Sequence, residues 1–286
     1  MKLPDPCTLF FLRLRSYLRF SLGRYRAYAN RPHLKEMAIK NFMDTLEIDR
    51  KDAEKKLFRL MQLEVFAERN SVLFDTCTAS ALEKRFTIHG LEKLDDAQQK
   101  GKGVIFATVH AGEAELFVLF LALKGYKMYG LYDSNILREA TRNPLHKFAK
   151  LKDKKLTGRI GKLYAGRSRP SVFDALKENG IIGWMVDLPA ASAKRSSTVR
   201  LFNTELAVNT SPWEVALKTG APLLPFVDIY DHKYDRHEVF IGDTIDLTKN
   251  VFQDLFTFYE SHLKGSPESW GGWYVLDLLK IKAKQR

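Results

Sequence analysis

The 286 residues are 45% hydrophobic and 28% charged, proportions that fit a folded chain with a sizeable core and exclude a collagen-like or wholly disordered one. The two cysteines, Cys7 and Cys77, exclude a disulfide framework and have no partner at metal-ligand spacing. Because 46 Lys and Arg residues outnumber 34 Asp and Glu residues, the formal net charge is +12, and we expect acidic partners such as anionic lipid, a phosphorylated substrate, an acidic carrier protein or nucleic acid.

The first patterned segment runs from Cys7 to Leu22 and reads CTLFFLRLRSYLRFSL. Arg13, Arg15 and Arg19 interrupt it, so it lacks the roughly 20 largely uncharged residues of a spanning helix and the unbroken apolar centre of a signal peptide. Basic residues among Phe, Leu and Tyr favour a helix that lies in a membrane interface. A core-facing helix with exposed arginines is the alternative. We expect no other segment to span a membrane, so action on a membrane would come from one side.

Helical periodicity dominates the first part of the chain, with helices expected at 8–27, 34–47 and 51–72. We therefore expect a helical N-terminal region over residues 1–80, with a possible place in a membrane interface. The remainder, 81–286, is expected to form one continuous catalytic domain.

Strands and helices alternate from about residue 85 onward. The expected strands are 86–90, 103–109, 127–133, 181–187, 222–230 and 237–243. The expected helices are 91–100, 114–123, 136–151, 170–178, 211–219 and 250–264. This alternation predicts an α/β fold with a mostly parallel central sheet flanked by helices. Because the strands are continuously apolar, we expect the sheet to be covered on both faces.

Polar residues stand at the carboxyl ends of these strands, where open α/β sheets usually bind ligands. His110, Asp133 and Asp187 each follow or end an expected strand. The sequence therefore predicts the functional site at this edge of the sheet.

A histidine and two glutamates interrupt apolar sequence in VHAGEAEL. His110 would lie on the turn between strand and helix, where Gly112 permits a tight bend. A carboxylate from the first helical turn can then reach the second ring nitrogen, and a histidine–carboxylate pair is a general base. Glu115 is the expected partner, although spacing leaves Glu113 open. The alternative is a histidine bonded to backbone beside a solvated glutamate.

Metal binding, other catalytic motifs and nucleic-acid binding have weaker support in the sequence. His232 and His237 lie in DHKYDRHE, which has metal-ligand residue types but is more typical of a charged hairpin turn, and His146 is expected on a solvated basic helix. There is no Gly-x-Ser-x-Gly elbow and no phosphate-cradling glycine loop. Nucleic acid is disfavoured as a partner because no stacking motif or reader module accompanies the positive charge.

The pattern His-x-x-x-x-Glu after an apolar strand resembles the signature of glycerolipid-type acyltransferases. The chain as a whole resembles one branch of them, the bacterial lipid A biosynthesis (lauroyl/myristoyl) acyltransferases, over most of residues 25–275. The blocks that carry the resemblance occur in the family's order: IKNFMDTLEI, GKGVIFATVHAGEAEL, NPLHKFAK, RPSVFDALKENGIIGWMVD, LFNTELAVNTSPWEVALKTGAPLLPF and SPESW.

This resemblance implies transfer of an acyl chain from an acyl carrier protein or coenzyme A thioester to a hydroxyl of a membrane lipid. It implies no cofactor beyond the thioester co-substrate, and a peripheral or interfacial place on the cytoplasmic face of the bacterial inner membrane. His110 takes the position of the catalytic base, and Glu115 takes that of the acid that orients it.

The resemblance also implies a set of substrate-binding residues. Asp187 matches the acid that ends the later strand. Arg169, with Arg167 close by, lies near a basic position that could hold an acceptor phosphate. Asn203 and Thr204 fall in a block expected to face the same site.

Several residues depart from the family's pattern. Glu113 replaces Asn and Ala114 replaces Trp in the pocket wall beside the base, Leu188 replaces Gln, and Leu201-Phe202-Asn203 replaces Phe-Phe-Gly. These changes favour the same reaction on another acceptor, such as a lysophospholipid, glycolipid, aminolipid or pigment-like hydroxyl. A non-catalytic relative that binds lipid or a carrier is a further alternative.

Two helices have expected roles of their own. Helix 114–123 is expected either to line an acyl-chain tunnel or to belong to the core. The basic helix 136–154 is expected either to face anionic lipid and the donor or to be solvated.

Overall fold

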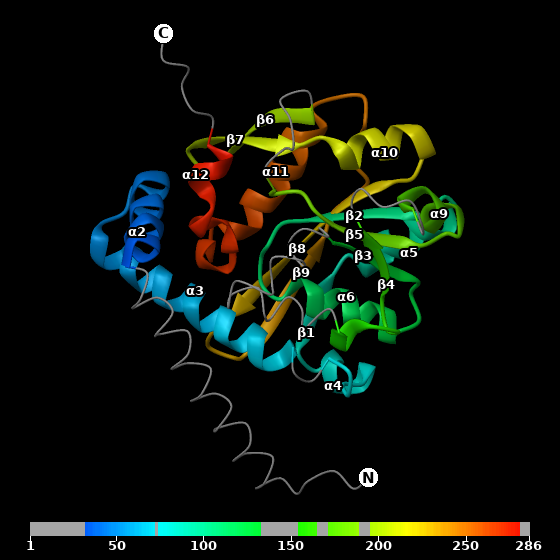
Figure 1. Ribbon diagram of the computed structural model, residues 1–286, viewed down its shortest axis with the longest axis horizontal. Helices are drawn as coiled ribbons and strands as arrows, with labels where there is room; N and C mark the ends of the chain where they lie inside the picture. Colours follow the sequence, from blue (N-terminus) through cyan, green and yellow to red (C-terminus); the bar gives the residue numbers. More distant parts are fainter. Residues whose placement is uncertain (1–31, 72–73, 133–153, 165–170, 189–194, 281–286) are drawn as a thin grey trace, which may run out of the picture.

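The computed structural model describes residues 32–71, 74–132, 154–164, 171–188 and 195–280, so the expected segments 7–22 and 136–151 lie outside the described residues (Figure 1). A seven-stranded sheet in the order β1-β9-β8-β2-β5-β3-β4 forms the centre of the described chain. Its strands are β1 (Phe86–His89), β2 (Val104–Thr108), β3 (Met128–Tyr132), β4 (Gly161–Tyr164), β5 (Ile181–Met185), β8 (Leu223–Asp231) and β9 (Arg236–Ile241).

Five adjacent strands of this sheet, from β8 to β4, run parallel to one another. β9 runs antiparallel to β8, and β1 pairs parallel with β9 at the edge. The predicted α/β fold with a mostly parallel sheet is therefore confirmed.

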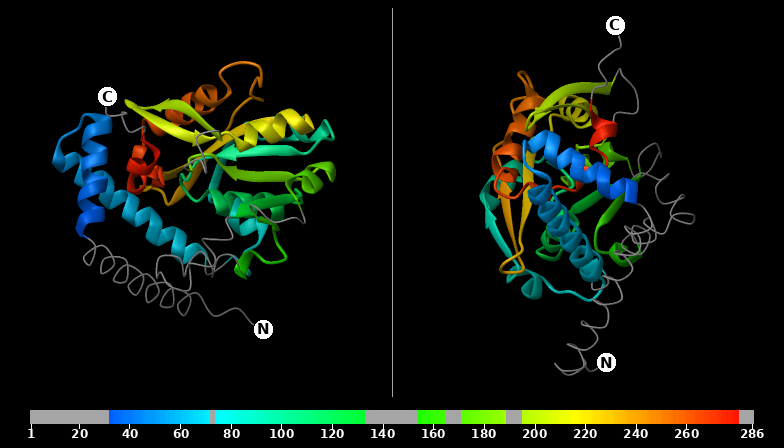
Figure 2. Two further views of the ribbon diagram at one scale, coloured as in Figure 1. Left: turned by 45° about the horizontal axis from the view of Figure 1, so that its top comes forward. Right: turned by 90° about the vertical axis from the view of Figure 1, so that its left-hand side faces the viewer.

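Strand β2 lies at the middle of the sheet, and all five of its residues are buried. Phe106 packs against Phe117 of helix α6 (Ala114–Leu123) on one face, with ring centroids 6.4 Å apart. Its neighbours Ile105 and Ala107 belong to the core on the other face, with helices α10 (Ser211–Thr219) and α11 (Val251–Leu263). Figure 2 shows helices on both sides of the strands, as the apolar strands predicted.

The helices that lie before β2 are α2 (Pro32–Leu46), α3 (Arg50–Ser71), α4 (Ala79–Glu83) and α5 (Leu91–Gln99). Those that follow β4 include α9 (Val172–Lys177), α12 (Leu276–Leu279) and the two 3-10 helices η2 (Pro267–Ser269) and η3 (Gly271–Tyr274). None of the described helices is both long enough and apolar enough to cross a membrane.

Helices α2 and α3 are tied to the end of the described chain, because α3 packs on η2 and α2 on η3. The buried carboxylate of Glu268 in η2 accepts hydrogen bonds from Lys56 (3.1 Å) and Arg59 (3.0 Å) of α3. The η2 helix also contacts β8, so the Trp270 segment lies beside the sheet. The division of the chain between residues 80 and 81 stays a prediction.

An antiparallel hairpin of β6 (Ser196–Leu201) and β7 (Thr204–Asn209) was not expected from the sequence. Phe202 at its turn adopts a positive φ of 53°, and its N–H donates to Glu260 of α11 at 2.6 Å. The hairpin is thus held by packing and a long-range hydrogen bond, which local sequence does not reveal.

Candidate active site

The pairing of β2 with β5 brings His110 and Asp187 together. Thr108 and Met185 are opposite each other at the ends of the two parallel strands. His110 and Asp187 each lie two residues beyond these ends, so the register places them side by side at the carboxyl edge of the sheet.

Asp187 binds the His110 ring and its backbone at once. Asp187 Oδ1 lies 2.7 Å from His110 Nδ1, and Oδ2 accepts from the His110 N–H at 2.9 Å. The indole Nε1 of Trp270 also donates to Oδ2, at 2.8 Å. This carboxylate is 1% exposed, whereas the His110 side chain is 48% exposed.

The surroundings of Asp187 favour its charged form. Burial raises the pKa of this carboxyl, but His110 and the hydrogen-bond donors outweigh burial, so the pKa lies below its ordinary value. An ionised carboxylate can only accept, so Nδ1 of His110 carries the proton that it receives. Nε2 is then the unprotonated nitrogen of the neutral ring, which is the arrangement that a general base requires.

Residues 110–113, the His110 turn, are joined to the segment around Trp270. Gly112 N–H donates to the Ser269 carbonyl at 2.9 Å, and Gly271 N–H donates to the His110 carbonyl at 2.6 Å. The SPESW block is therefore part of the site, a role that the sequence analysis did not predict for Trp270. A lone tryptophan distant in sequence gives no signal for this contact.

Gly112 is required by the close approach of the turn to β8. Its φ is 57°, and an added Cβ would lie 2.4 Å from the carboxyl carbon of Asp228. Any larger residue would therefore displace either the turn or Asp228.

Glu113 does not form the pocket wall that the sequence analysis expected. It is 5% exposed, and its carboxylate accepts from the Asn70 amide at 2.7 and 3.0 Å. It also lies 3.4 Å from His237 Nε2 and 3.8 Å from Arg85. These contacts hold the Glu113 carboxylate inside the fold.

The carboxylate on His110 Nδ1 comes from Asp187, where the sequence analysis expected Glu115. Glu115 stands in the first turn of α6 and is partly buried. Its catalytic role stays a prediction.

The other expected site residues fall into two groups. Arg167 and Arg169 lie outside the described residues. Asn203 donates to Glu47 at 3.1 Å, and Thr204 hydrogen bonds Thr45 at 3.2 Å. Both contacts lead to the end of α2, so the hydrogen bonds of Asn203 and Thr204 connect them to the N-terminal helices and not to His110.

The contacts of helix α6 place it in the hydrophobic core. Leu116, Phe117, Leu119 and Leu121 are at most 2% exposed, and Phe117 packs against Phe226 with centroids 5.6 Å apart. Helix 114–123 was expected either to line an acyl-chain tunnel or to belong to the core, and these contacts support the core position.

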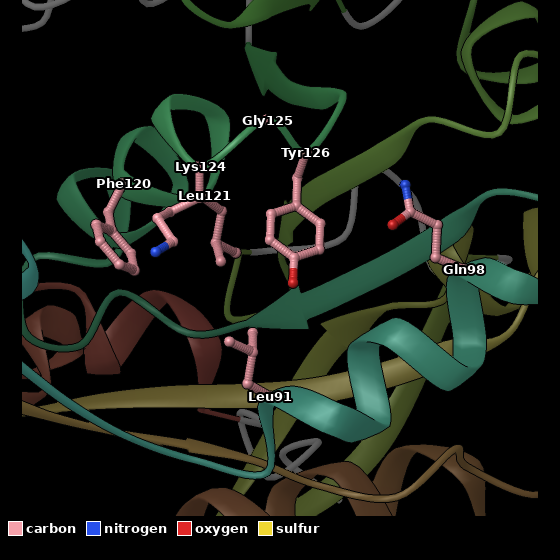
Figure 3. Close-up of a pocket in the computed structure, with 7 residues that line it drawn as sticks. All are labelled: Leu91, Gln98, Phe120, Leu121, Lys124, Gly125 and Tyr126. Atoms are coloured by element: carbon pink, nitrogen blue, oxygen red, sulfur yellow. The ribbon is translucent and has the colours of Figure 1, made fainter. Parts of the chain in front are cut away.

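A pocket of about 300 Å³ lies at the other end of α6 (Figure 3). It is lined by Leu91, Gln98, Phe120, Leu121, Lys124, Gly125 and Tyr126. Gly125 and Tyr126 precede β3, whereas His110 follows β2, and parallel strands place these positions at opposite edges of the sheet. The pocket is therefore separate from the histidine site.

His232 and His237 lie in the connection and second strand of the β8–β9 hairpin, which confirms the predicted hairpin. No cluster of His, Cys, Asp and Glu suited to a metal was found among the described residues. His237 Nδ1 instead lies 2.9 Å from Asp228 Oδ2, and its Nε2 faces Glu113. At 3.4 Å the second contact is an ion pair without good hydrogen-bond direction, since this nitrogen has no hydrogen-bond partner.

His237 predicts a pH dependence of stability. Burial lowers its pKa, but Asp228 and Glu113 outweigh burial and raise it from 6.5 to about 10. The folded protein therefore holds this proton more tightly than the unfolded chain does. Its stabilisation is complete below about pH 6.5 and is lost as the pH rises toward 10, by about 1 kcal/mol per pH unit.

The measurement is urea unfolding of wild type and His237→Gln at pH 7 and pH 9.5. We expect the difference in free energy of unfolding between the two proteins to shrink at the higher pH. A difference that stays constant or grows would contradict a charged His237.

The chain is similar in sequence to known bacterial acyltransferases. The sequence profile described as bacterial lipid A biosynthesis acyltransferase matches residues 64–274, which include His110, Asp187 and Trp270. The lipid A biosynthesis acyltransferase of Haemophilus influenzae is 23% identical over 204 residues, 70% of this chain and 61% of that protein. The chain thus spans less than two thirds of this relative. Because the profile covers most of its length, the chain belongs to the bacterial lipid A biosynthesis acyltransferase family.

Proposed function

We propose that the protein is a membrane-associated O-acyltransferase that moves a fatty acyl chain from a thioester to a hydroxyl of a lipid A-type or related glycolipid acceptor. The donor is an acyl carrier protein or coenzyme A thioester. The observation that carries the proposal is the His110–Asp187 pair at the carboxyl edge of the sheet, inside the region that matches the family.

His110 acts as the general base in this reaction. Its Nε2 accepts the proton of the acceptor hydroxyl while the oxygen attacks the thioester carbonyl carbon. The carbon–sulfur bond then breaks, and the imidazolium returns the proton to the leaving thiolate. Asp187 holds Nδ1 and stabilises the imidazolium, so it is a positioning residue that acts through His110.

The remaining roles come from the resemblance. Glu115 is retained as the second catalytic acid, since it occupies the acid position of the His-x-x-x-x-Glu pattern. Arg167 and Arg169 are proposed to bind an acceptor phosphate, for which the guanidinium fork is suited. The reaction needs no cofactor beyond the acyl thioester.

The proposed location is the cytoplasmic face of the bacterial inner membrane. The net charge of +12 supports contact with anionic lipid and attraction of an acidic carrier or of coenzyme A phosphates. Leu188 is 40% exposed directly after Asp187, so an apolar side chain adjoins the site, as a lipid substrate requires.

Substitutions at the site test the catalytic roles. We expect His110→Ala to lower kcat/KM for acyl transfer by about 1,000-fold or more, and Asp187→Asn and Glu115→Gln by about 100-fold or more. Transfer is measured with radiolabelled acyl thioester and membrane lipid extract.

His89→Ala is the matched control for this series. His89 is also 48% exposed and also lies beside a carboxylate, 3.0 Å from Glu238, but it belongs to the edge strand β1. Activity should survive this substitution. Full activity of His110→Ala would contradict every catalytic account and favour a lipid- or carrier-binding protein.

The acceptor is tested by comparing lipids from cells with and without the gene. If the acceptor is of the lipid A type, mass spectrometry detects a gain of one acyl chain on phosphorylated glucosamine lipid when the gene is present. The alternative, a lysophospholipid, aminolipid or pigment-like hydroxyl, is favoured by Leu188 at the position where the family pattern has Gln. It predicts unchanged lipid A and a mass shift in another lipid.

A further inference from the structure

A second histidine–carboxylate pair lies beneath the His110 turn. His237 of β9 stands between Asp228 of β8, at 2.9 Å, and Glu113 of the turn, at 3.4 Å. These three side chains are at most 2% exposed, so none of them can meet a substrate without a large rearrangement.

The buried acids of the cluster face basic side chains. Arg85, which is 22% exposed, lies 3.8 Å from Glu113 and 3.5 Å from Asp235. Two carboxylates, Glu113 and Asp228, therefore face a charged His237 and the Arg85 guanidinium. Pairing of this kind is what permits buried charges, since an unpaired one would be costly.

The cluster is bonded to the backbone of the turn as well as to its side chain. Asp228 Oδ2 accepts from the Glu113 N–H at 2.7 Å, and Gly112 leaves room for Asp228 to approach. Asn70, in the last turn of α3, donates to the Glu113 carboxylate. The end of the turn is thus fixed by contacts to β8, β9 and α3.

The start of the same turn is held by Asp187, which accepts from the His110 backbone and faces its ring. β8 and β5 are the two neighbours of β2, so the turn that follows β2 is held by Asp228 of β8 and by Asp187, which follows β5. A change at Glu113 or Asp228 would consequently shift His110 relative to Asp187.

We infer that Glu113, Asp228 and His237 are positioning residues, which fix the His110 turn and so align His110 for catalysis without touching substrate. The catalytic consequence rests on the proposed acyl transfer. The geometric consequence, a turn fixed by buried charges, is independent of which reaction occurs.

The test compares Glu113→Gln, His237→Gln and the double variant with wild type. Glu113→Gln keeps the size of the side chain and an oxygen for Asn70 but removes the charge. We expect each single variant to lose about 10- to 100-fold in kcat with KM little changed, because misalignment of a catalytic group affects the chemical step. The double variant should lose less than the two single losses combined, since the two charges are coupled.

Hydrogen exchange supplies a second readout that a general loss of stability would not reproduce. In Glu113→Gln, amides of residues 108–115 should exchange faster while those of distant helices such as α10 stay protected. Asp95→Asn is the control, because it removes an acid that binds the Tyr126 hydroxyl at 2.6 Å at the opposite edge of the sheet. It should change neither kcat nor exchange at 108–115.

Unchanged kcat with unchanged exchange in Glu113→Gln would overturn the inference, and so would an even rise in exchange over the whole chain. If His237→Gln fails to fold, the results for Glu113→Gln by themselves decide whether the cluster positions the His110 turn. If wild type transfers no acyl chain, the proposed function fails, and the exchange measurement by itself still decides whether these residues fix the turn.

Discussion

The candidate site depends on how the His110 turn is fastened between two buried aspartates. Asp187 binds its first residue and Asp228 binds the backbone N–H of its last. Asp228 lies in β8 and Asp187 follows β5, and these two strands neighbour β2, so the strand order and register determine where His110 lies. The Trp270 segment then covers the turn through hydrogen bonds to its backbone. The position of His110 therefore depends on the sheet and not on the turn sequence alone.

Burial separates the two histidines that this arrangement brings close to carboxylates. His237 is fully buried between two acids, and its raised pKa keeps it charged at neutral pH. His110 also lies beside a buried acid, but about half of its side chain is exposed. Each pair joins a histidine to a buried carboxylate, but only the His110 ring reaches the surface, where it can meet a substrate.

Much of the architecture follows from sequence patterns. The apolar runs of β2, β5 and β8 and the helix 211–219 were placed nearly as they occur, because continuous burial and a proline in the first turn are local signals. His110 was identified because a histidine after an apolar strand is unusual. The hairpin 196–209 was missed, since it is held by contacts with α11 that are distant in sequence.

The acid on His110 Nδ1 was missed for the same reason. Glu115 is near in sequence, but the acid on Nδ1 is 77 residues away and arrives through strand pairing. Glu113 was expected at a pocket wall because it stands where the family pattern has Asn, yet partners from α3, β8 and β9 allow its burial. Spacing along the sequence indicates which side chains have suitable chemistry. The register of the paired strands determines which of them lie side by side.

The central claim is that Asp187 holds the proton of His110 on Nδ1 and leaves Nε2 to act as the base. Nitrogen-15 NMR of the His110 ring, assigned with a His110→Gln sample, measures this directly in wild type and Asp187→Asn. In the neutral ring of wild type we expect a protonated Nδ1 and an unprotonated Nε2, and a change in this balance in Asp187→Asn. A wild-type ring protonated on Nε2, or spectra that do not differ between the two proteins, would contradict the account.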